Sequence, residues 1–212
     1  MKVFNTLVGA ADLAHHLHDA RWRVFDCSFD LVHPHAGELA YREVHIPGAI
    51  YAHLERDLSG PLTGRNGRHP LPDPARFAAR LSEWGVGNDT QVVVYDDAGG
   101  TYAGRMWWML RWLGHDAVAL LDGGINAWEA AGYETSDAET KHPHAVFMPR
   151  LRPDMTVDAR FVESQSARDG VRLLDARNPQ RFRGENETLA PVGGHIPGAV
   201  NRLFKDNLLP DG

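Results

Sequence analysis

The pentapeptide His-Ile-Pro-Gly-Ala occurs twice in this chain, at residues 45–49 and again at residues 195–199, an offset of 195 − 45 = 150. Each pentapeptide is preceded by two apolar residues and an aspartate, Val-Phe-Asp at residues 24–26 and Leu-Leu-Asp at residues 173–175. These two tripeptides are 149 residues apart, nearly the same offset as that of the pentapeptides. A shared motif in a matching context indicates an internal duplication. The sequence therefore predicts two copies of one structural unit.

The two copies differ in length. The first extends to about residue 133, and a polar stretch rich in histidine and proline follows it, as is typical of a linker. The second copy begins near Met155 and reaches Gly212, less than half the length of the first. We expect a first domain at residues 1–134, a linker at 135–154 and the N-terminal part of a second domain at 155–212.

The first copy alternates short apolar runs with helical segments. The apolar runs at residues 23–29, 91–96 and 117–121 predict buried strands, and the run at 91–96 lacks polar alternation, as expected of a strand covered on both faces. Helices are predicted at residues 74–84, 101–113 and 125–131, each followed directly by a glycine that can end it. This alternation predicts a parallel α/β sheet with residues 91–96 as its central strand.

Composition narrows the function classes. The chain is 43% hydrophobic and 24% charged with a net charge of −6, an ordinary globular composition that argues against a nucleic-acid binder. It holds no run of 18 apolar residues, and its first residues lack the pattern of a signal peptide. The single cysteine, Cys27, excludes an internal disulfide and a cysteine-cluster zinc site. We expect a cytoplasmic protein with no membrane partner.

The predicted central strand leads into the loop Asp96-Asp97-Ala98-Gly99-Gly100 and then into a helix. A glycine-rich turn at a helix N-terminus forms an anion cradle and can lower the pKa of a thiol. Here two carboxylates stand in that place, which would repel an anionic ligand and supply no thiolate. The same loop also weakly matches an aspartyl-nucleophile phosphatase, but Ala98 stands where that chemistry needs its second aspartate.

Several motifs in order resemble the tandem-domain rhodanese family, the thiosulfate and 3-mercaptopyruvate sulfurtransferases, over essentially the whole chain. They are the repeated pentapeptide, VVVYD at residues 92–96, RMWWMLRWLGH at 105–115 and LLDGGINAW at 120–128. The resemblance implies a rhodanese-like fold, a parallel five-stranded sheet with helices on both faces, followed here by an incomplete second copy. It also implies a silent first domain and a second domain whose cysteine carries a sulfane sulfur, as a persulfide, to cyanide or a thiol.

The resemblance places Asp96 at the position of that cysteine. Carried onto the second copy, the cysteine would fall near 96 + 150 = 246, beyond Gly212, so we expect a chain truncated before its catalytic residue and inactive on its own. Arg181, in the context Arg-Phe-Arg-Gly, matches the arginine that binds the anionic donor, and Arg177 and Arg183 are neighbours that could assist. A guanidinium offers a planar fork to the oxygens of such a donor.

The resemblance implies as partners a small anionic sulfur donor and a thiophilic acceptor, no cofactor or metal, and a monomer at full length. The residues do not choose between thiosulfate and 3-mercaptopyruvate. An alternative of another class stays open: a non-catalytic rhodanese-like module that binds an anion or a partner protein without turnover.

Other side chains with chemical potential are expected to be structural. Cys27 is predicted to be a small buried hydrophobe. His45 and His195 are predicted to make structural hydrogen bonds in their turns. His15 and His18 have helical spacing, but no further ligand completes a metal set. Core packing, rather than base stacking, is expected of the tryptophans Trp107, Trp108 and Trp112.

Overall fold

The computed structural model describes residues 2–165, 168 and 170–209. The described residues divide into two compact units, one within residues 2–152 and one within residues 153–209. No helix of the described residues has the length and apolar character needed to cross a membrane.

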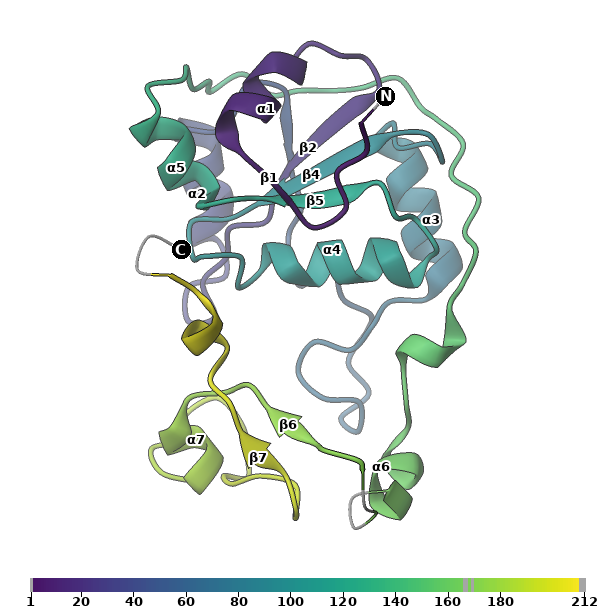
Figure 1. Ribbon diagram of the computed structural model, residues 1–212, viewed down its shortest axis with the longest axis vertical. Coiled ribbons are helices and arrows are strands. Elements are labelled where there is room, and N and C mark those ends of the chain that lie inside the picture. Colours follow the sequence, from purple (N-terminus) through teal and green to yellow (C-terminus); the bar gives the residue numbers. More distant parts are fainter. Residues whose placement is uncertain (1, 166–167, 169, 210–212) are drawn as a thin grey trace. The chain divides into compact units, whose positions relative to one another are not determined.

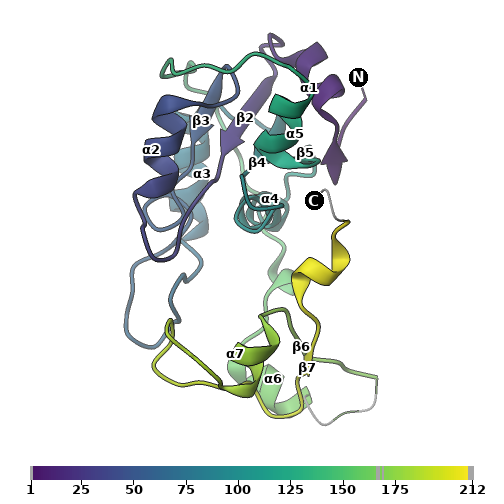
Figure 2. The same ribbon diagram turned by 90° about the vertical axis from the view of Figure 1, so that its left-hand side faces the viewer.

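Within the described residues, the first unit contains a five-stranded sheet in the order β1-β5-β4-β2-β3, with every neighbouring pair parallel. The strands are β1 (Leu7–Val8), β2 (Trp22–Asp26), β3 (Ala49–Tyr51), β4 (Gln91–Tyr95) and β5 (Val118–Leu121). Figure 2 shows β2 and β4 in the middle of the sheet, flanked by β3 and β5. The prediction of a parallel α/β sheet with residues 91–96 at its centre is confirmed, because all five residues of β4 are buried.

Helices cover both faces of this sheet. They are α1 (Ala10–His16), α2 (Ala36–Glu43), α3 (Pro74–Glu83), α4 (Ala103–Trp112) and α5 (Gly124–Ala130). Residues of α1, α2 and α5, among them Leu13, Tyr41 and Trp128, form one core with alternate strand residues such as Val24 and Val93. Figure 1 shows α1 and α5 on one side of the sheet and α4 on the other.

Local signals explain where the helices begin. The Asp73 side chain accepts a hydrogen bond from the Arg76 backbone N–H at 2.9 Å, and Pro74 takes the first helical position of α3, as predicted. Helix α4 begins two residues later than the predicted Thr101. The Asp96 side chain accepts the backbone N–H groups of Tyr102 and Ala103 at this end of the helix, an interaction that the sequence did not reveal.

The stretch expected to be a linker packs against the first unit up to residue 152. Phe147 is buried there, and its N–H donates to the Ser82 hydroxyl at 3.0 Å. The Arg150 N–H donates to the Leu113 carbonyl at 2.8 Å. These contacts place residues 135–152 with the first unit, whereas the boundaries at 134 and 154 stay a prediction from the duplication.

The second unit is small and open. It contains α6 (Ala159–Gln165), β6 (Leu174–Asp175), α7 (Pro179–Arg183), β7 (Val200–Asn201) and two 3₁₀ turns, at Pro153–Met155 and Phe204–Asn207. Taken as whole residues, none of the described residues from Pro153 onward is buried. Strand β6 is only two residues long, and within the described residues it pairs only with β7.

Candidate functional site

The loop after β4 forms the anion cradle that the sequence indicated, and the chain's own carboxylate fills it. Oδ1 of Asp96 accepts the N–H groups of Ala98 and Gly100 at 2.9 and 2.8 Å. Oδ2 accepts those of Tyr102 and Ala103 at 2.7 and 2.9 Å. Asp96 is 1% exposed. The cradle donors are therefore satisfied internally, and an external anion has no free donor among these four.

This geometry also weighs against the phosphatase interpretation. A nucleophilic carboxylate needs an oxygen that can attack, but both oxygens of Asp96 accept two backbone hydrogen bonds each. Ala98 contributes only its backbone N–H, so no acid or base stands at the second position of that motif.

Cys27 lies directly after β2 and is 1% exposed, so the prediction of a structural thiol is confirmed. Its Sγ lies 3.8 Å from the Met106 sulfur. Burial, followed by the negative charges of Asp26, Asp96 and Asp57, raises the pKa of Cys27 well above its usual value. A thiol in this state is neither ionised nor accessible to a sulfur donor.

The predicted donor-binding residue, Arg181, lies in α7 and forms a two-bond pair with Glu187. Its Nε donates to Oε2 of Glu187 at 2.9 Å and its Nη2 to Oε1 at 3.1 Å. The Glu187 side chain is only 5% exposed, and its Oε1 also accepts the N–H groups of Leu189 and Ala190 at 2.8 and 2.9 Å. The pairing with Arg181, and then these backbone donors, lower the pKa of Glu187.

The two neighbouring arginines have other partners. Arg177 donates from Nε to both oxygens of Asp175, at 2.9 and 3.1 Å, and from Nη2 to the Gly194 carbonyl at 2.7 Å. Arg183 pairs with Glu185 at 2.8 and 2.9 Å, and both side chains are about half exposed. The structure thus brings three arginines together near α7, each matched with a carboxylate.

A hollow of about 550 Å³ lies beside β6 in the second unit. It is lined by residues 173–177, 192–196 and 199, and Arg181 is not among them. Its one arginine, Arg177, is already neutralised by Asp175. The lining is otherwise largely apolar, so this hollow is an uncovered face of the short sheet rather than an anion pocket.

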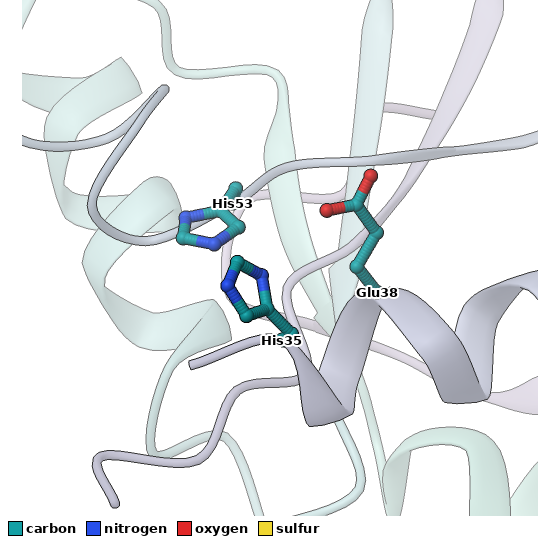
Figure 3. A group of neighbouring side chains, drawn as sticks. All are labelled: His35, Glu38 and His53. Atoms are coloured by element: carbon teal, nitrogen blue, oxygen red, sulfur yellow. The ribbon is translucent and has the colours of Figure 1, made fainter. Parts of the chain in front are cut away.

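Sequence reasoning missed one group in the first unit. His35 and Glu38 lie three positions apart at the start of α2, and His53 follows β3, so that their ligand atoms lie within 4.8 Å of one another (Figure 3). Helical spacing of His35 and Glu38 was the only signal in the sequence, because the approach of His53 depends on the tertiary fold.

The chemistry of this group does not fit a resident metal ion. Nδ1 of His53 accepts the N–H groups of Glu55 and Arg56 at 3.1 and 3.2 Å, so the neutral ring carries its proton on Nε2, the nitrogen otherwise available to a metal. A metal-binding histidine instead donates from its second nitrogen. The Glu38 carboxylate is also paired, with Arg42 at 3.0 Å and Arg56 at 3.3 Å.

The histidines of the two repeated turns are structural, as predicted. Nδ1 of His45 lies 2.6 Å from the Tyr41 carbonyl oxygen, and Nδ1 of His195 lies 2.7 Å from that of Phe182. On α1, His16 stacks on Trp22 rather than contributing to a ligand set. Trp112 packs in the core, whereas Trp107 and Trp108 are half-buried, so core packing describes only part of this helix.

Comparison with known proteins places these features in context. A model of the rhodanese-like domain matches residues 9–131. A probable 3-mercaptopyruvate sulfurtransferase of Pseudomonas aeruginosa is 48% identical over 208 residues, which is 97% of this chain and 73% of that relative. A thiosulfate sulfurtransferase of Gallus gallus is 35% identical over 196 residues, 90% of this chain and 65% of the relative.

Among solved structures, SseA of Escherichia coli, described with the rhodanese fold of the 3-mercaptopyruvate enzymes, superimposes with a TM-score of 0.83 at 31% identity. The match covers 97% of this chain and 78% of SseA. This chain therefore spans about two thirds to three quarters of the length of these proteins.

Proposed function

This chain belongs to the rhodanese family, and on that premise we propose that it serves a sulfurtransferase reaction, in which a sulfane sulfur passes from thiosulfate or 3-mercaptopyruvate to a thiophilic acceptor. The observation that carries the proposal is the likeness, over nearly the whole chain, to sulfurtransferases that carry these two donor names. We place the reaction in the cytoplasm, with a small anionic donor, a thiol or cyanide as acceptor, and neither nucleic acid nor membrane as partner.

The proposed chemistry passes through a cysteine persulfide. A thiolate attacks the sulfane sulfur of thiosulfate, the S–S bond breaks, and sulfite leaves with the bonding electrons. Cyanide then attacks the outer sulfur of the persulfide, forms thiocyanate and regenerates the thiolate. With 3-mercaptopyruvate, the C–S bond breaks and pyruvate leaves after protonation of its enolate.

We propose that residues 1–134 form the silent rhodanese-like domain and that residues 155–212 begin a second one. The register supports this. In the first unit Phe25 lies opposite Ile50, and at offsets of 149 and 150 Leu174 lies opposite Val200 in the second. Asp96 takes the place of the cysteine in the first domain, and the cysteine of the second would fall near position 246.

We assign the donor oxygens to Arg181. Its charge, its partial exposure of 29% and its match to the arginine context of the family support this role. The sequence context favours Arg181 over Arg177 and Arg183, because only Arg181 stands at the first position of the Arg-Phe-Arg-Gly motif.

The proposal is tested in two steps. The polypeptide of 212 residues is assayed for thiocyanate from thiosulfate and cyanide, and for pyruvate from 3-mercaptopyruvate; we expect no turnover, because its one thiol is buried with a raised pKa. Activity that disappears in Cys27→Ser would show that this thiol was misassigned. The coding frame beyond Gly212 is then read for a cysteine near position 246, and the protein that carries it is expected to turn over.

A non-catalytic module is the second candidate. The self-filled cradle at Asp96 favours it, because the described residues then offer no reactive group at the end of the central strand. Binding of thiosulfate or of a partner protein, without turnover in any form that carries the residue 246 region, would support this candidate over the enzyme.

A further inference from the structure

The guanidinium of Arg181 has one edge in use and one edge free. An arginine carries five N–H donors, which lie along a side edge of Nε and Nη2 and an end edge of Nη1 and Nη2. Glu187 takes the side edge through both of its oxygens. Among the described residues Nη1 forms no hydrogen bond or ion pair, so the end edge can take a second planar pair of acceptors.

The carboxylate that holds Arg181 is itself held by the backbone. Oε1 of Glu187 accepts the N–H groups of Leu189 and Ala190, and its side chain is 5% exposed. Its position is therefore set by the turn at residues 187–190 and not only by the arginine. A long, otherwise mobile side chain thus acquires one direction, since a bidentate pair fixes both the distance and the plane of the guanidinium.

Neither Arg177 nor Arg183 combines a free end edge with a buried partner carboxylate that the backbone holds in place. Arg177 uses its side edge for Asp175 and a further Nη2 contact for Gly194, and its Nη1 lies 4.0 Å from Glu187. Within the part of the chain that the structure describes, the Arg183 side chain is held only by Glu185, a partner that is itself 50% exposed. An exposed pair of this kind fixes little, because solvent competes for both groups.

We propose that Glu187 is a positioning residue: it holds the side edge of Arg181 so that the end edge presents Nη1 and Nη2 to two oxygens of the anionic sulfur donor. The inference rests on the proposed function and deepens it. A sulfonate and a carboxylate both offer two oxygens in one plane, so the same edge serves thiosulfate and 3-mercaptopyruvate. A lysine at position 181 could supply the charge but not this two-point fit.

The test uses the whole polypeptide of 212 residues, labelled with ¹⁵N and titrated with thiosulfate. In the wild type we expect a distinct Nε–H signal from Arg181, held by Glu187, and saturable perturbation of its Nη groups. Glu187→Gln keeps the shape but removes the charge, so that signal should broaden, and thiosulfate affinity should fall about tenfold. Glu185→Gln, the matched control on the exposed pair, should change affinity less than about twofold.

The outcomes distinguish the positioning role of Glu187 from the donor-binding role of Arg181. Backbone amide signals of Val200 and Asn201 at wild-type positions establish that each variant keeps the β6–β7 pair. Equal affinities in wild type and Glu187→Gln, or tighter binding in Glu187→Gln, would overturn the positioning role alone. Absence of thiosulfate binding in the wild type, or unchanged binding in Arg181→Ala, would overturn the donor site itself. Arg181→Lys should bind as weakly as Glu187→Gln, and wild-type affinity in that variant would contradict the two-point fit.

Discussion

The imidazole of His195 stacks on the ring of Phe182, with ring centroids 3.7 Å apart and planes 9° apart, and its Nδ1 lies 2.7 Å from the carbonyl oxygen of the same phenylalanine. His45 and Tyr41 repeat this arrangement, at 4.1 Å and 18°, with Nδ1 2.6 Å from the Tyr41 carbonyl. A histidine therefore opens each repeated turn because one ring supplies both a stacking face and a hydrogen bond.

The two histidines should contribute unequally to stability. His45 is fully buried and has a second contact, from Nε2 to the Ala138 carbonyl at 3.1 Å, so His45→Ala should lower the free energy of unfolding by about 3 kcal/mol. His195 is exposed, and His195→Ala should lower it by less than about 1 kcal/mol. Urea unfolding followed by tryptophan fluorescence measures the effect of His45→Ala, because all six tryptophans lie between residues 22 and 128. The backbone amide signals of Val200 and Asn201, followed in the same urea series, measure the effect of His195→Ala. Equal losses would contradict the assignment of these turns to a buried and an exposed setting.

Asp96 should be a strong local determinant of stability although it performs no chemistry. Asp96→Ala leaves four backbone N–H groups without their acceptor, and we expect a loss of about 3–4 kcal/mol. Asp97→Ala, at the exposed neighbouring position, should change stability by less than about 0.5 kcal/mol. Added sulfate should raise the melting temperature of Asp96→Ala more than that of the wild type, because an external anion can then enter the emptied cradle.

A loss no larger in Asp96→Ala than in Asp97→Ala would show that the four hydrogen bonds are not needed to hold the loop. An equal response of the wild type and Asp96→Ala to sulfate would show that the emptied cradle takes no anion.

Strand β4 and the loop at residues 96–103 that follows it show what the sequence could and could not predict. The apolar run of residues 91–95 sufficed to predict a central strand, because a strand covered on both faces has a local signature. The same sequence suggested that Asp96 would repel anions. It could not show that the loop turns Tyr102 and Ala103 back onto that carboxylate, since this depends on glycines at positive φ such as Gly99 and Gly100.

Contacts between distant segments were likewise beyond the reach of periodicity. Arg105 lies within the helix predicted at residues 101–113, but the sequence does not show that its guanidinium donates to the carbonyl oxygens of Leu58, His69 and Pro70 and so anchors that loop. The pairing of Arg181 with Glu187 lies six residues apart and outside any helical spacing. Both depend on how irregular segments fold back, for which short-range patterns carry no information.

Asp26 should make stability depend on pH in a direction opposite to that of most carboxylates. It is 2% exposed, and burial raises its pKa to about 6 from an ordinary 3.8. Between about pH 4 and pH 6 the folded state therefore binds more protons at this group than the unfolded state does. The stability that this protonation contributes is complete below pH 4 and is lost as the pH rises through 6.

The variant Asp26→Asn tests this pH dependence. Its side chain keeps an oxygen that can accept the Ser28 N–H, which Oδ1 of Asp26 accepts at 2.8 Å in the wild type. The free energy of unfolding of Asp26→Asn minus that of the wild type should rise by up to about 3 kcal/mol between pH 4 and pH 7. Chemical denaturation at several pH values measures this difference. A flat difference, or one that falls with pH, would show that Asp26 is ionised in the folded protein throughout.

Hydrogen exchange should show that the two units differ in stability. Two backbone hydrogen bonds of nearly equal length can be compared, one in a buried strand and one in an exposed strand. The Val92 N–H donates to the Ala117 carbonyl at 2.8 Å inside a strand that is fully buried, and the Val200 N–H donates to the Leu173 carbonyl at 2.9 Å. Val200 is 40% exposed and Leu174 is 62% exposed. Protection reflects the free energy needed to open each bond, and that energy comes from the apolar surface buried around it rather than from the bond itself.

We therefore expect the Val92 amide to exchange only on global unfolding of the first unit, and the Val200 amide to exchange at least about a thousandfold faster. Short pairs of strands without a covered hydrophobic face are marginal in water, and none of the described residues from Pro153 onward is buried. The Arg202 amide, bonded to Asp175 at 3.0 Å, serves as the internal replicate. Slow exchange at Val200 and Arg202, equal to that at Val92, would show that residues 155–212 form an independently stable domain.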